Sequence, residues 1–269
     1  MNKFQLKDND ILIGICHSAE SQINRLELVT NIYLKQGYFQ DIPSIAIDGN
    51  AEELIDHRGF TFIKNKLSVS QFELFLKTGL LFRTSCQKHL YLDKYFWQSI
   101  NFFARSKEGC AGSLRLIMSK PICDDALFTL PTKSNMELQV FSEWLQRISE
   151  VNVELSQFAK EKAAPTATVV ALLRAAAQFS LSNSIFDWIA TTDNRVLRLL
   201  NGYYFNFQLP AIGPSTYYLG SESTPILINI ENSLQCAASK ESSKEIARYI
   251  RGENLPTYNN CFFSIQDLS

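Results

Sequence analysis

The chain has 269 residues, with 26 Lys plus Arg against 27 Asp plus Glu, so its formal net charge is −1. Because 46% of the residues are hydrophobic and 20% are charged, the composition excludes a disordered chain and predicts a globular protein. The lack of a positive excess argues against nucleic acid as a partner. At about 150 residues per domain, the length fits one large domain or two small ones.

The cysteine and histidine content excludes two further classes of protein. Six cysteines are too few for a disulfide scaffold, and no two of them form a CxxC pair. The histidines His17, His57 and His89 are isolated from one another, so we expect no metal site. The chain starts without the apolar stretch of a signal peptide, and no apolar run approaches the roughly 20 residues that span a bilayer. These features predict a cytoplasmic protein with reduced thiols and no transmembrane segment.

The first half of the chain predicts a helix and a hairpin. Apolar residues recur at three- and four-residue steps over 20–36, which predicts a helix that stops at Gly37 and carries Arg25 on its polar side. Residues 41–92 give mixed signals, apart from a short helical pattern over 71–81. Residues 97–105 and 111–119 are typical of strands, and the turn residues 107–109 between them predict a hairpin.

The second half begins with a helix predicted over 136–149, whose apolar stripe is Leu138, Phe141, Leu145 and Ile148. Residues 151–159 alternate as a strand. One face of this strand carries Val151, Val153 and Leu155, and the other carries Asn152, Glu154, Ser156 and Phe158. A carboxylate and a hydroxyl are therefore expected on the same side of a sheet.

The remaining signals alternate between helix and strand. We expect an Ala-rich helix capped by Thr166 or Thr168 that runs towards Ile189, and a shorter helix from the cap Asp193 to Asn201. Strands are predicted over 203–208, 216–220 and 225–230, with turns over 209–214 and 221–224, and a last helix over 239–251. This order predicts an α/β (α+β) domain, in which helices cover a mixed sheet.

Two motifs resemble a known signature. Gly112-Ser113-Leu114-Arg115-Leu116-Ile117, and later Glu154-Leu155-Ser156-Gln157-Phe158, resemble the G-x-x-R-L-[LIM] and E-x-S-R-[FL] motifs of acyl-homoserine-lactone synthases and N-acyl amino acid synthases. Weaker similarities, some of them shared with exosortase-associated acyltransferases, lie in 25–38, 93–104 and 197–225. The resemblance spans residues 20–230, except for an insertion at 43–90.

The resemblance implies the GNAT (acyl-CoA N-acyltransferase) fold, a mixed twisted sheet with a splayed central strand pair and helices on both faces. Residues 1–269 would then form a single domain, with the insertion at 43–90 and the C-terminal helix at 239–251. The implied activity moves a fatty acyl group from the phosphopantetheine thioester of an acyl carrier protein to the amine of an amino acid or a similar small amine. Acyl-CoA is a second donor, and no covalently bound cofactor is expected.

In this reading the catalytic residues are Glu154 and Ser156. Glu154 would be the general base, although a free Glu titrates near about 4.3, so burial or a water relay must make it basic enough. Ser156 would protonate or orient the leaving thiolate. The structural alternative is that Glu154 is the cross-strand ion-pair partner of Arg115. An arginine that orients the base would satisfy both readings.

The same resemblance suggests residues that contact the substrates. Arg25 and Tyr33 would close the acceptor pocket, or simply belong to an amphipathic helix. Asp93 would bind the acceptor's ammonium, or be a solvated turn carboxylate. Arg115, Gln157 and Phe158 complete the implied substrate site.

The donor protein should meet a basic surface. Lys160, Lys162 and Arg174, beside the positive end of the helix that follows, would bind an acidic acyl carrier protein, or form an ordinary solvated charge run. The Phe and Ala residues over 171–188 would line an acyl tunnel or belong to the core.

Two departures from the signature matter for function. Phe96 replaces the second acid of a D-x-[YF]-D motif, and Gln157 replaces the arginine of E-x-S-R. In the lactone synthases those charged residues help to bind S-adenosylmethionine, so the substitutions argue against that acceptor. The alternatives to an N-acyl amino acid synthase are therefore an acyl-homoserine-lactone (autoinducer) synthase and a non-catalytic GNAT-fold protein that binds acyl ligands.

Overall fold

The computed structural model of the protein describes residues 6–47, 50–85, 87–119, 129–139 and 142–264. Its main sheet is mixed and has eight strands in the order β11-β1-β5-β6-β7-β8-β10-β9. In chain order these strands are β1 (Ile11–Ile15), β5 (Ser99–Ser106), β6 (Gly109–Met118), β7 (Val153–Lys160), β8 (Asp187–Asp193), β9 (Thr216–Tyr218), β10 (Ser221–Asn229) and β11 (Cys261–Phe263). The predicted hairpin is confirmed as β5 and β6, and a 3-10 turn over Phe96–Gln98 precedes it.

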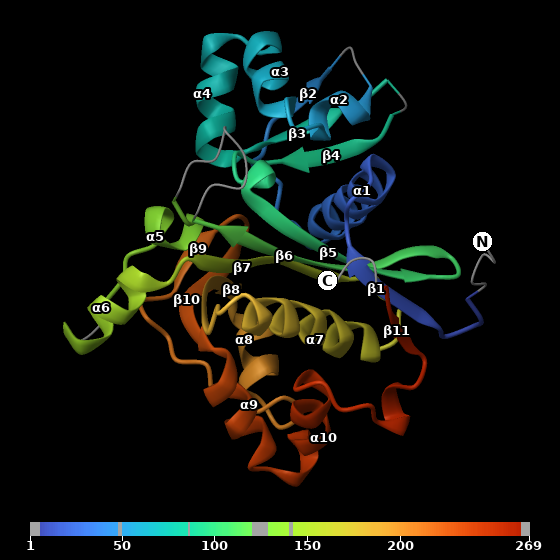
Figure 1. Ribbon diagram of the computed structural model, residues 1–269. Helices are drawn as coiled ribbons and strands as arrows, with labels where there is room; N and C mark the ends of the chain where they lie inside the picture. The colour runs from blue at the N-terminus through green and yellow to red at the C-terminus, as the bar shows by residue number, and fades with distance from the viewer. Residues whose placement is uncertain (1–5, 48–49, 86, 120–128, 140–141, 265–269) are drawn as a thin grey trace.

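Helices cover both faces of this sheet (Figure 1). On one face lies α1 (Ala19–Gln36), which Gly37 ends in the left-handed conformation as predicted. The other face is covered by α7 (Ala167–Ser182), with α8 (Asn194–Asn201), α9 (Ile230–Ala238) and α10 (Glu241–Ile250) below it. The core packs between α7 and the strands, with side chains such as Ile13, Phe102 and Leu172 fully buried.

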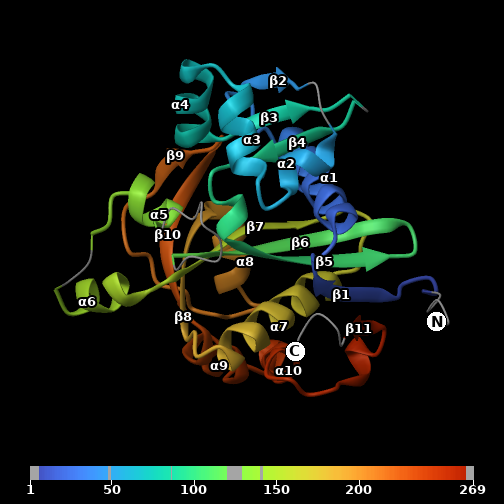
Figure 2. The same ribbon diagram turned by 45° about the horizontal axis from the view of Figure 1, so that its top comes forward.

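The described residues of 44–92, whose sequence signals were mixed, form a small layer above α1 (Figure 2). They contain β2 (Ser44–Ala46), α2 (Ala51–Ile55), α3 (Gly59–Lys66), α4 (Val69–Thr78), β3 (Leu80–Arg83) and β4 (His89–Leu92). The strands make a second sheet in the order β2-β3-β4. A cluster of its own, with Leu54, Ile63, Phe75 and Phe82 fully buried, holds this layer together.

The strands β7 and β8 are parallel neighbours that separate. Only one residue pair, Glu154 with Ile189, is in register between them, although both strands continue beyond it. Beyond Glu154, the edge of β7 that faces β8 pairs with no strand among the described residues. This divergence is the splayed strand pair that the fold assignment predicted.

The predicted helix towards Ile189 is wrong in its second half. The helix α7 ends at Ser182, and 187–193 form β8, which pairs antiparallel with β10. Trp188, Ile189 and Ala190 are buried in succession because helices cover both faces of this strand, so the segment lacks the alternation that marks a half-exposed strand. Thr166 is the N-cap residue of α7, one of the two expected positions, but its side chain makes no capping hydrogen bond, and Thr168 lies inside the helix.

Three other predicted boundaries differ from the structure. Residues 203–208 are not a strand. Phe205 and Phe207 are buried, but Asn206 and Gln208 have positive φ, so the alternation of apolar and polar residues does not come from extended backbone. The turn expected over 221–224 lies earlier, at Leu219 and Gly220, and β10 already begins at Ser221. The helix expected over 136–149 is seen as α6 (Ser142–Glu150), after a separate α5 (Pro131–Asn135); residues 140 and 141 lie outside the described ranges.

Other boundaries are confirmed. Asp193 caps α8, because its carboxylate accepts the backbone N–H of Arg195 at 2.7 Å. The predicted final helix corresponds to α10. None of the helices in the described residues is both long enough and apolar enough to cross a bilayer. Clusters of His, Cys, Asp and Glu suited to a metal ion are likewise not found within those ranges.

Candidate active site

A cavity of about 430 Å³ lies where β7 and β8 separate. Its lining comes from both faces of the sheet. On the α1 face it includes Tyr33, Tyr91, Tyr95, Tyr218, Asp93 and Arg115, and on the α7 face it includes Leu173, Trp188, Val196, Leu200, Phe207 and Leu209. Glu154, Ser156, Gln157 and Phe158 of β7 lie between the two groups. The cavity therefore passes through the sheet, from a polar chamber on one side to an apolar one on the other.

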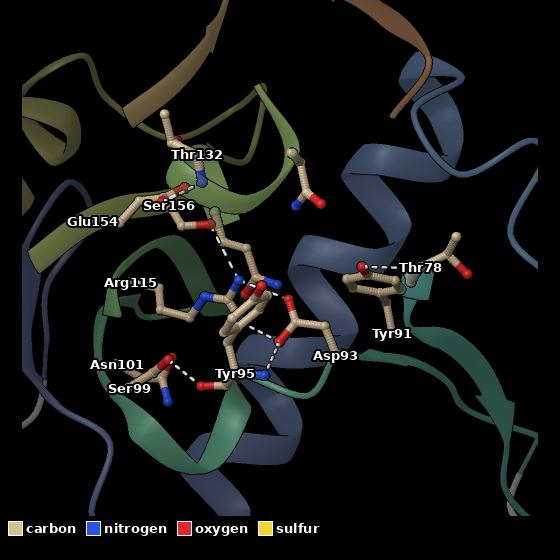
Figure 3. Close-up of polar contacts among 12 residues, drawn as sticks. Thr78, Tyr91, Asp93, Tyr95, Ser99, Asn101, Arg115, Thr132, Glu154 and Ser156 are labelled. Carbon is tan, nitrogen blue, oxygen red and sulfur yellow. Dashed lines mark hydrogen bonds and ion pairs between the residues drawn. The ribbon is translucent and has the colours of Figure 1, made fainter. Parts of the chain in front are cut away.

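Glu154 is a buried carboxyl group at the start of the divergence. Its side chain accepts the backbone N–H of Thr132 at 2.8 Å, and it forms no ion pair within the described residues (Figure 3). Burial raises the pKa of Glu154 to about 8, although the hydrogen bonds from Thr132 and the charge of Arg115 oppose the shift. A carboxylate with this pKa can accept a proton near neutral pH.

The structural alternative, an ion pair between Glu154 and Arg115, is wrong. Across the ladder, Glu154 is opposite Ile117, whereas Arg115 is opposite Ser156. The guanidinium of Arg115 instead makes a two-pronged contact with Asp93, at 2.9 and 2.8 Å, and donates a third bond to Ser156 at 3.1 Å. The side chain of Asp93 also accepts the backbone N–H of Tyr95. Asp93 is thus a buried partner of Arg115, not a solvated turn carboxylate.

This ion pair sets the charge and the donors around Ser156. Burial opposes the charged form of Arg115, but the Asp93 carboxylate outweighs that effect and raises the pKa of Arg115. Ser156 Oγ receives a hydrogen bond from Arg115, so its own proton is free to point elsewhere. Ser156 can therefore donate into the cavity that it lines.

Arg25 is not on the polar side of α1, as predicted, but fully buried against the sheet. Its guanidinium donates to Gln157 Oε1 at 2.9 and 2.8 Å, to Asn101 Oδ1 at 2.6 Å and to Ser113 Oγ at 3.3 Å. All three acceptors are neutral, and burial lowers the pKa of Arg25 to about 10. The arginine still carries its charge at neutral pH, without a carboxylate partner among the described residues.

A bulge in β7 brings Gln157 to this arginine. The register with β6 shifts between Ser113, which faces Ala159, and Arg115, which faces Ser156, and Gln157 has φ +45°. Gln157 therefore lies on the α1 face together with Ser156, despite being its neighbour in sequence. Phe158 is displaced to the opposite face, where it packs against the main core, so its expected place beside Glu154 and Ser156 is wrong.

Tyrosines surround the polar chamber. Tyr33 lies edge-on to Tyr38, with ring centroids 5.2 Å apart, and burial raises its pKa. Tyr91, which donates to the carbonyl of Thr78 at 2.9 Å, belongs to the inserted layer. Sequence reasoning missed Tyr91 and Thr132 as cavity or site residues, because they lie in segments without a clear pattern. Tyr95 lies in the segment compared with D-x-[YF]-D, but only its neighbours Asp93 and Phe96 were given a role. Tyr218 lies in a motif that the resemblance included, but it was not singled out.

Two of the three basic residues predicted to meet a carrier protein are engaged within the chain. The ammonium of Lys160 donates to the carbonyls of Glu161 and Ala164, at 2.8 and 2.6 Å. Arg174 donates to the carbonyls of Gly252 and Glu253, both at 2.8 Å, and stacks over Tyr249. Of these three residues, only Lys162 is exposed and makes no side-chain hydrogen bond or ion pair within the described part of the chain.

Comparisons with known proteins agree with this architecture. No protein-family model and no curated protein matches the sequence. Among solved structures, FeeM, an N-acyl amino acid synthase from uncultured soil microbes, is 13% identical with a TM-score of 0.50, over 84% of this chain and 94% of its own. The AHL synthase LasI is 13% identical with a TM-score of 0.46, over 81% and 88% of the two chains. A CoA-dependent acyl-homoserine lactone synthase, MesI, is 9% identical with a TM-score of 0.42, over 95% and 99%.

The likeness to FeeM and the separated strands β7 and β8 define the fold. The protein has the GNAT-type α/β fold of the N-acyltransferases, in the form seen in an N-acyl amino acid synthase. The resemblance inferred from the sequence is thereby confirmed at the level of the fold.

Proposed function

We propose that the protein is an N-acyltransferase that moves an acyl group from a thioester to a primary amine. The observation that carries this proposal is the position of Glu154, a buried carboxyl with a pKa of about 8, at the point where a cavity crosses the sheet. The polar chamber would take the amine, and the apolar chamber beside Leu173 and Phe207 would take the acyl chain. Both substrates would then meet beside Glu154.

The residues support a direct reaction. The neutral amine adds to the thioester carbonyl, forming a C–N bond and moving the carbonyl electron pair onto oxygen. Glu154 takes the proton that the amine nitrogen loses. The electron pair on oxygen then re-forms the C=O bond as the C–S bond breaks. The thiolate that leaves receives a proton from Ser156, which is reprotonated from solvent or from Glu154. The unpaired edge of β7 offers backbone donors and acceptors to the amide groups of a phosphopantetheine arm.

We further propose an acyl carrier protein as the donor, with acyl-CoA as the other candidate, and an amino acid or a similar small amine as the acceptor. Both donors carry the phosphopantetheine arm that the open edge of β7 suits. This reaction fits the cytoplasmic location predicted from the sequence, because these thioesters are made there.

The residues do not favour S-adenosylmethionine as the acceptor. Phe96, at the position of the missing acid, is buried in the cluster of the inserted layer. Gln157, at the position of the missing arginine, is neutral, and the Asp93 carboxylate is already paired with Arg115. Asp193, the other carboxylate among the described lining residues, is paired with Arg195, so Glu154 is the one carboxylate in that part of the lining without a cationic partner for a sulfonium to replace.

The proposal is tested with purified protein, acyl carrier proteins loaded with chains of different length, the matching acyl-CoA thioesters and pooled amino acids. We expect thiol release that depends on the amine, and an N-acyl product by mass spectrometry. Glu154→Gln should slow both by about 10²–10⁴-fold, whereas Glu108→Gln, in the exposed β5–β6 turn, should leave them unchanged. If neither donor is consumed, or if Glu154→Gln turns over like the wild type, acyl transfer at this site is wrong. Binding of acyl ligands without turnover would favour the non-catalytic alternative.

A further inference from the structure

The side-chain amide of Gln157 is held with its nitrogen away from Arg25. A guanidinium has five donors and no acceptor, so the atom that meets both of its terminal nitrogens must be the carbonyl oxygen of the amide. The amide nitrogen, Nε2, must then face the other way. Within the described residues it donates to nothing, yet Gln157 is only 6% exposed and lines the cavity.

The amide is also polarised. Two hydrogen bonds from a cation draw electron density towards Oε1, which makes the N–H groups of Nε2 stronger donors. The charge of Arg25 is not cancelled locally, because Gln157, Asn101 and Ser113 are all neutral. Arg115 differs in this respect, since Asp93 binds it with both oxygens. Arg25 is therefore a buried cation whose field is exerted on Gln157.

The bulge in β7 gives this donor its place. In a regular strand the side chain of Gln157 would point to the face opposite Ser156. The positive φ at Gln157 puts it on the same face as Glu154 and Ser156, next to the proposed proton acceptor and proton donor. The strained backbone thus adds a third polar group to one side of the gap between β7 and β8.

We propose that Gln157 Nε2 donates a hydrogen bond to the oxyanion that forms when the amine adds to the thioester carbonyl, and that Arg25 strengthens this donor through Oε1. The inference rests on the proposed acyl transfer. In it Gln157 is a catalytic residue, because it touches the reacting oxygen, and Arg25 is a positioning residue. Gln157, at the place of the signature arginine, then supplies a neutral donor. The cation of Arg25 lies behind it, on the Oε1 side of the amide.

The test is Gln157→Glu, which keeps an oxygen for Arg25 and replaces the N–H donor with a second acceptor. We expect kcat to fall by about 10²–10³-fold, the loss typical of one oxyanion donor, with the acceptor KM unchanged. The melting temperature should be kept or raised, because the new carboxylate pairs with Arg25. An unchanged kcat would overturn the proposal. A raised acceptor KM at constant kcat would also overturn it, by showing that Gln157 binds the acceptor instead.

Asn101→Asp tests the contribution of Arg25 without touching Gln157. The carboxylate would neutralise Arg25 from the β5 side and weaken the polarisation, so we expect a smaller fall in kcat, again with constant KM. No change in kcat would remove Arg25 from the proposal. The Glu154→Gln variant distinguishes a failure of this inference from a failure of the proposed function. If the wild type transfers acyl groups and Glu154→Gln is much slower, a Gln157→Glu variant with unchanged kcat refutes only the oxyanion donor. If the wild type transfers no acyl group, acyl transfer itself fails.

Discussion

At the scale of single residues, burial and the choice of partner give each polar group its role. Glu154 and Asp93 are both buried carboxyls near the same cavity, 3% and 8% exposed. Asp93 has a guanidinium against both oxygens, so both are engaged in the ion pair, whereas Glu154 has mainly the backbone N–H of Thr132. One carboxyl is therefore structural, and the other is free to exchange a proton.

The raised pKa of Glu154 predicts opposite pH dependences for activity and stability. A general base must be ionised, so kcat should rise with pH through about 8, and Glu154→Gln should lose this inflection together with about 10²–10⁴-fold in rate. Folding favours the protonated carboxyl, so its contribution to stability is fully present below about pH 4.5 and is lost as the pH rises to about 8. The melting temperature of Glu154→Gln should therefore exceed that of the wild type more at pH 9 than at pH 5. Equal differences at both pH values would contradict the raised pKa.

The ion pair of Asp93 and Arg115 should stabilise the fold mainly because each group removes the free-energy cost of burying the other's charge alone. Asp93→Asn leaves the Arg115 charge buried and unpaired, so we expect a loss of about 3–5 kcal/mol in the free energy of unfolding, measured with urea. Asp93→Asn combined with Arg115→Met should cost less than the two single changes together. As a control, breaking the exposed pair of Lys107 and Asp8 should cost about 0–1 kcal/mol. Additive losses in the double variant would show that the two groups do not interact.

At the scale of elements, the decisive features are the bulge in β7 and the separation of β8 from it. The bulge places Ser156 and Gln157 on one face, and the separation leaves the backbone edge of β7 open. Neither follows from hydrophobic periodicity, since the two-residue alternation predicted Phe158 on the face of Glu154, and the Ala-rich pattern predicted a helix that continues into β8. Local signals succeeded for the extent of α1 and for the β5–β6 hairpin, because Gly37 and the turn residues 107–109 mark their ends in the sequence itself.

The helix α7 provides only part of the expected acyl tunnel. Of the residues over 171–188, Leu173 and Trp188 line the cavity, whereas Ala171, Ala175 and Ala176 belong to the packed core. Leu173→Trp should fill the apolar chamber and lower kcat/KM for a dodecanoyl donor more than for a butyryl donor. Overpacking should cost about 1–3 kcal/mol of stability, and Leu173→Met, of similar volume, serves as the control. Equal losses for both chain lengths would mean that the acyl chain lies elsewhere.

At the scale of the whole molecule, the small layer formed by the described residues of 44–92 and the main sheet share one cavity. Phe75 and Tyr91 of this layer line it together with β7, and α1 contacts both sheets. That a single domain comprises the whole chain stays a prediction, which a single cooperative unfolding transition would support. The proposed binding of an acyl carrier protein also belongs to this scale, because it would depend on which cations are left exposed.

The three predicted carrier-binding cations differ in their contacts: Lys162 is exposed, whereas Lys160 and Arg174 are bonded within the chain. Lys162→Glu should raise KM for the carrier-protein donor, by up to about five-fold at low salt, and change KM for acyl-CoA less.

Arg174→Met should instead lower the free energy of unfolding by about 2–3 kcal/mol, because Arg174 bonds the segment after α10, and it should leave KM unchanged. If Arg174→Met raised KM for the carrier-protein donor but not for acyl-CoA, Arg174 would belong to the carrier-binding surface after all.

The sequence by itself determined what depends on neighbours in the chain: the Gly37 stop, the Asp193 cap, the β5–β6 hairpin, and the two-residue spacing that puts Glu154 and Ser156 on one face. Its motifs, in their order, also indicated the fold. Only the tertiary structure decided that Arg115 pairs with Asp93, that Gln157 turns towards Arg25, and that 187–193 is a strand. The physical reason is that a pKa, an ion pair or a register shift depends on groups brought together from distant parts of the chain, which no local pattern records.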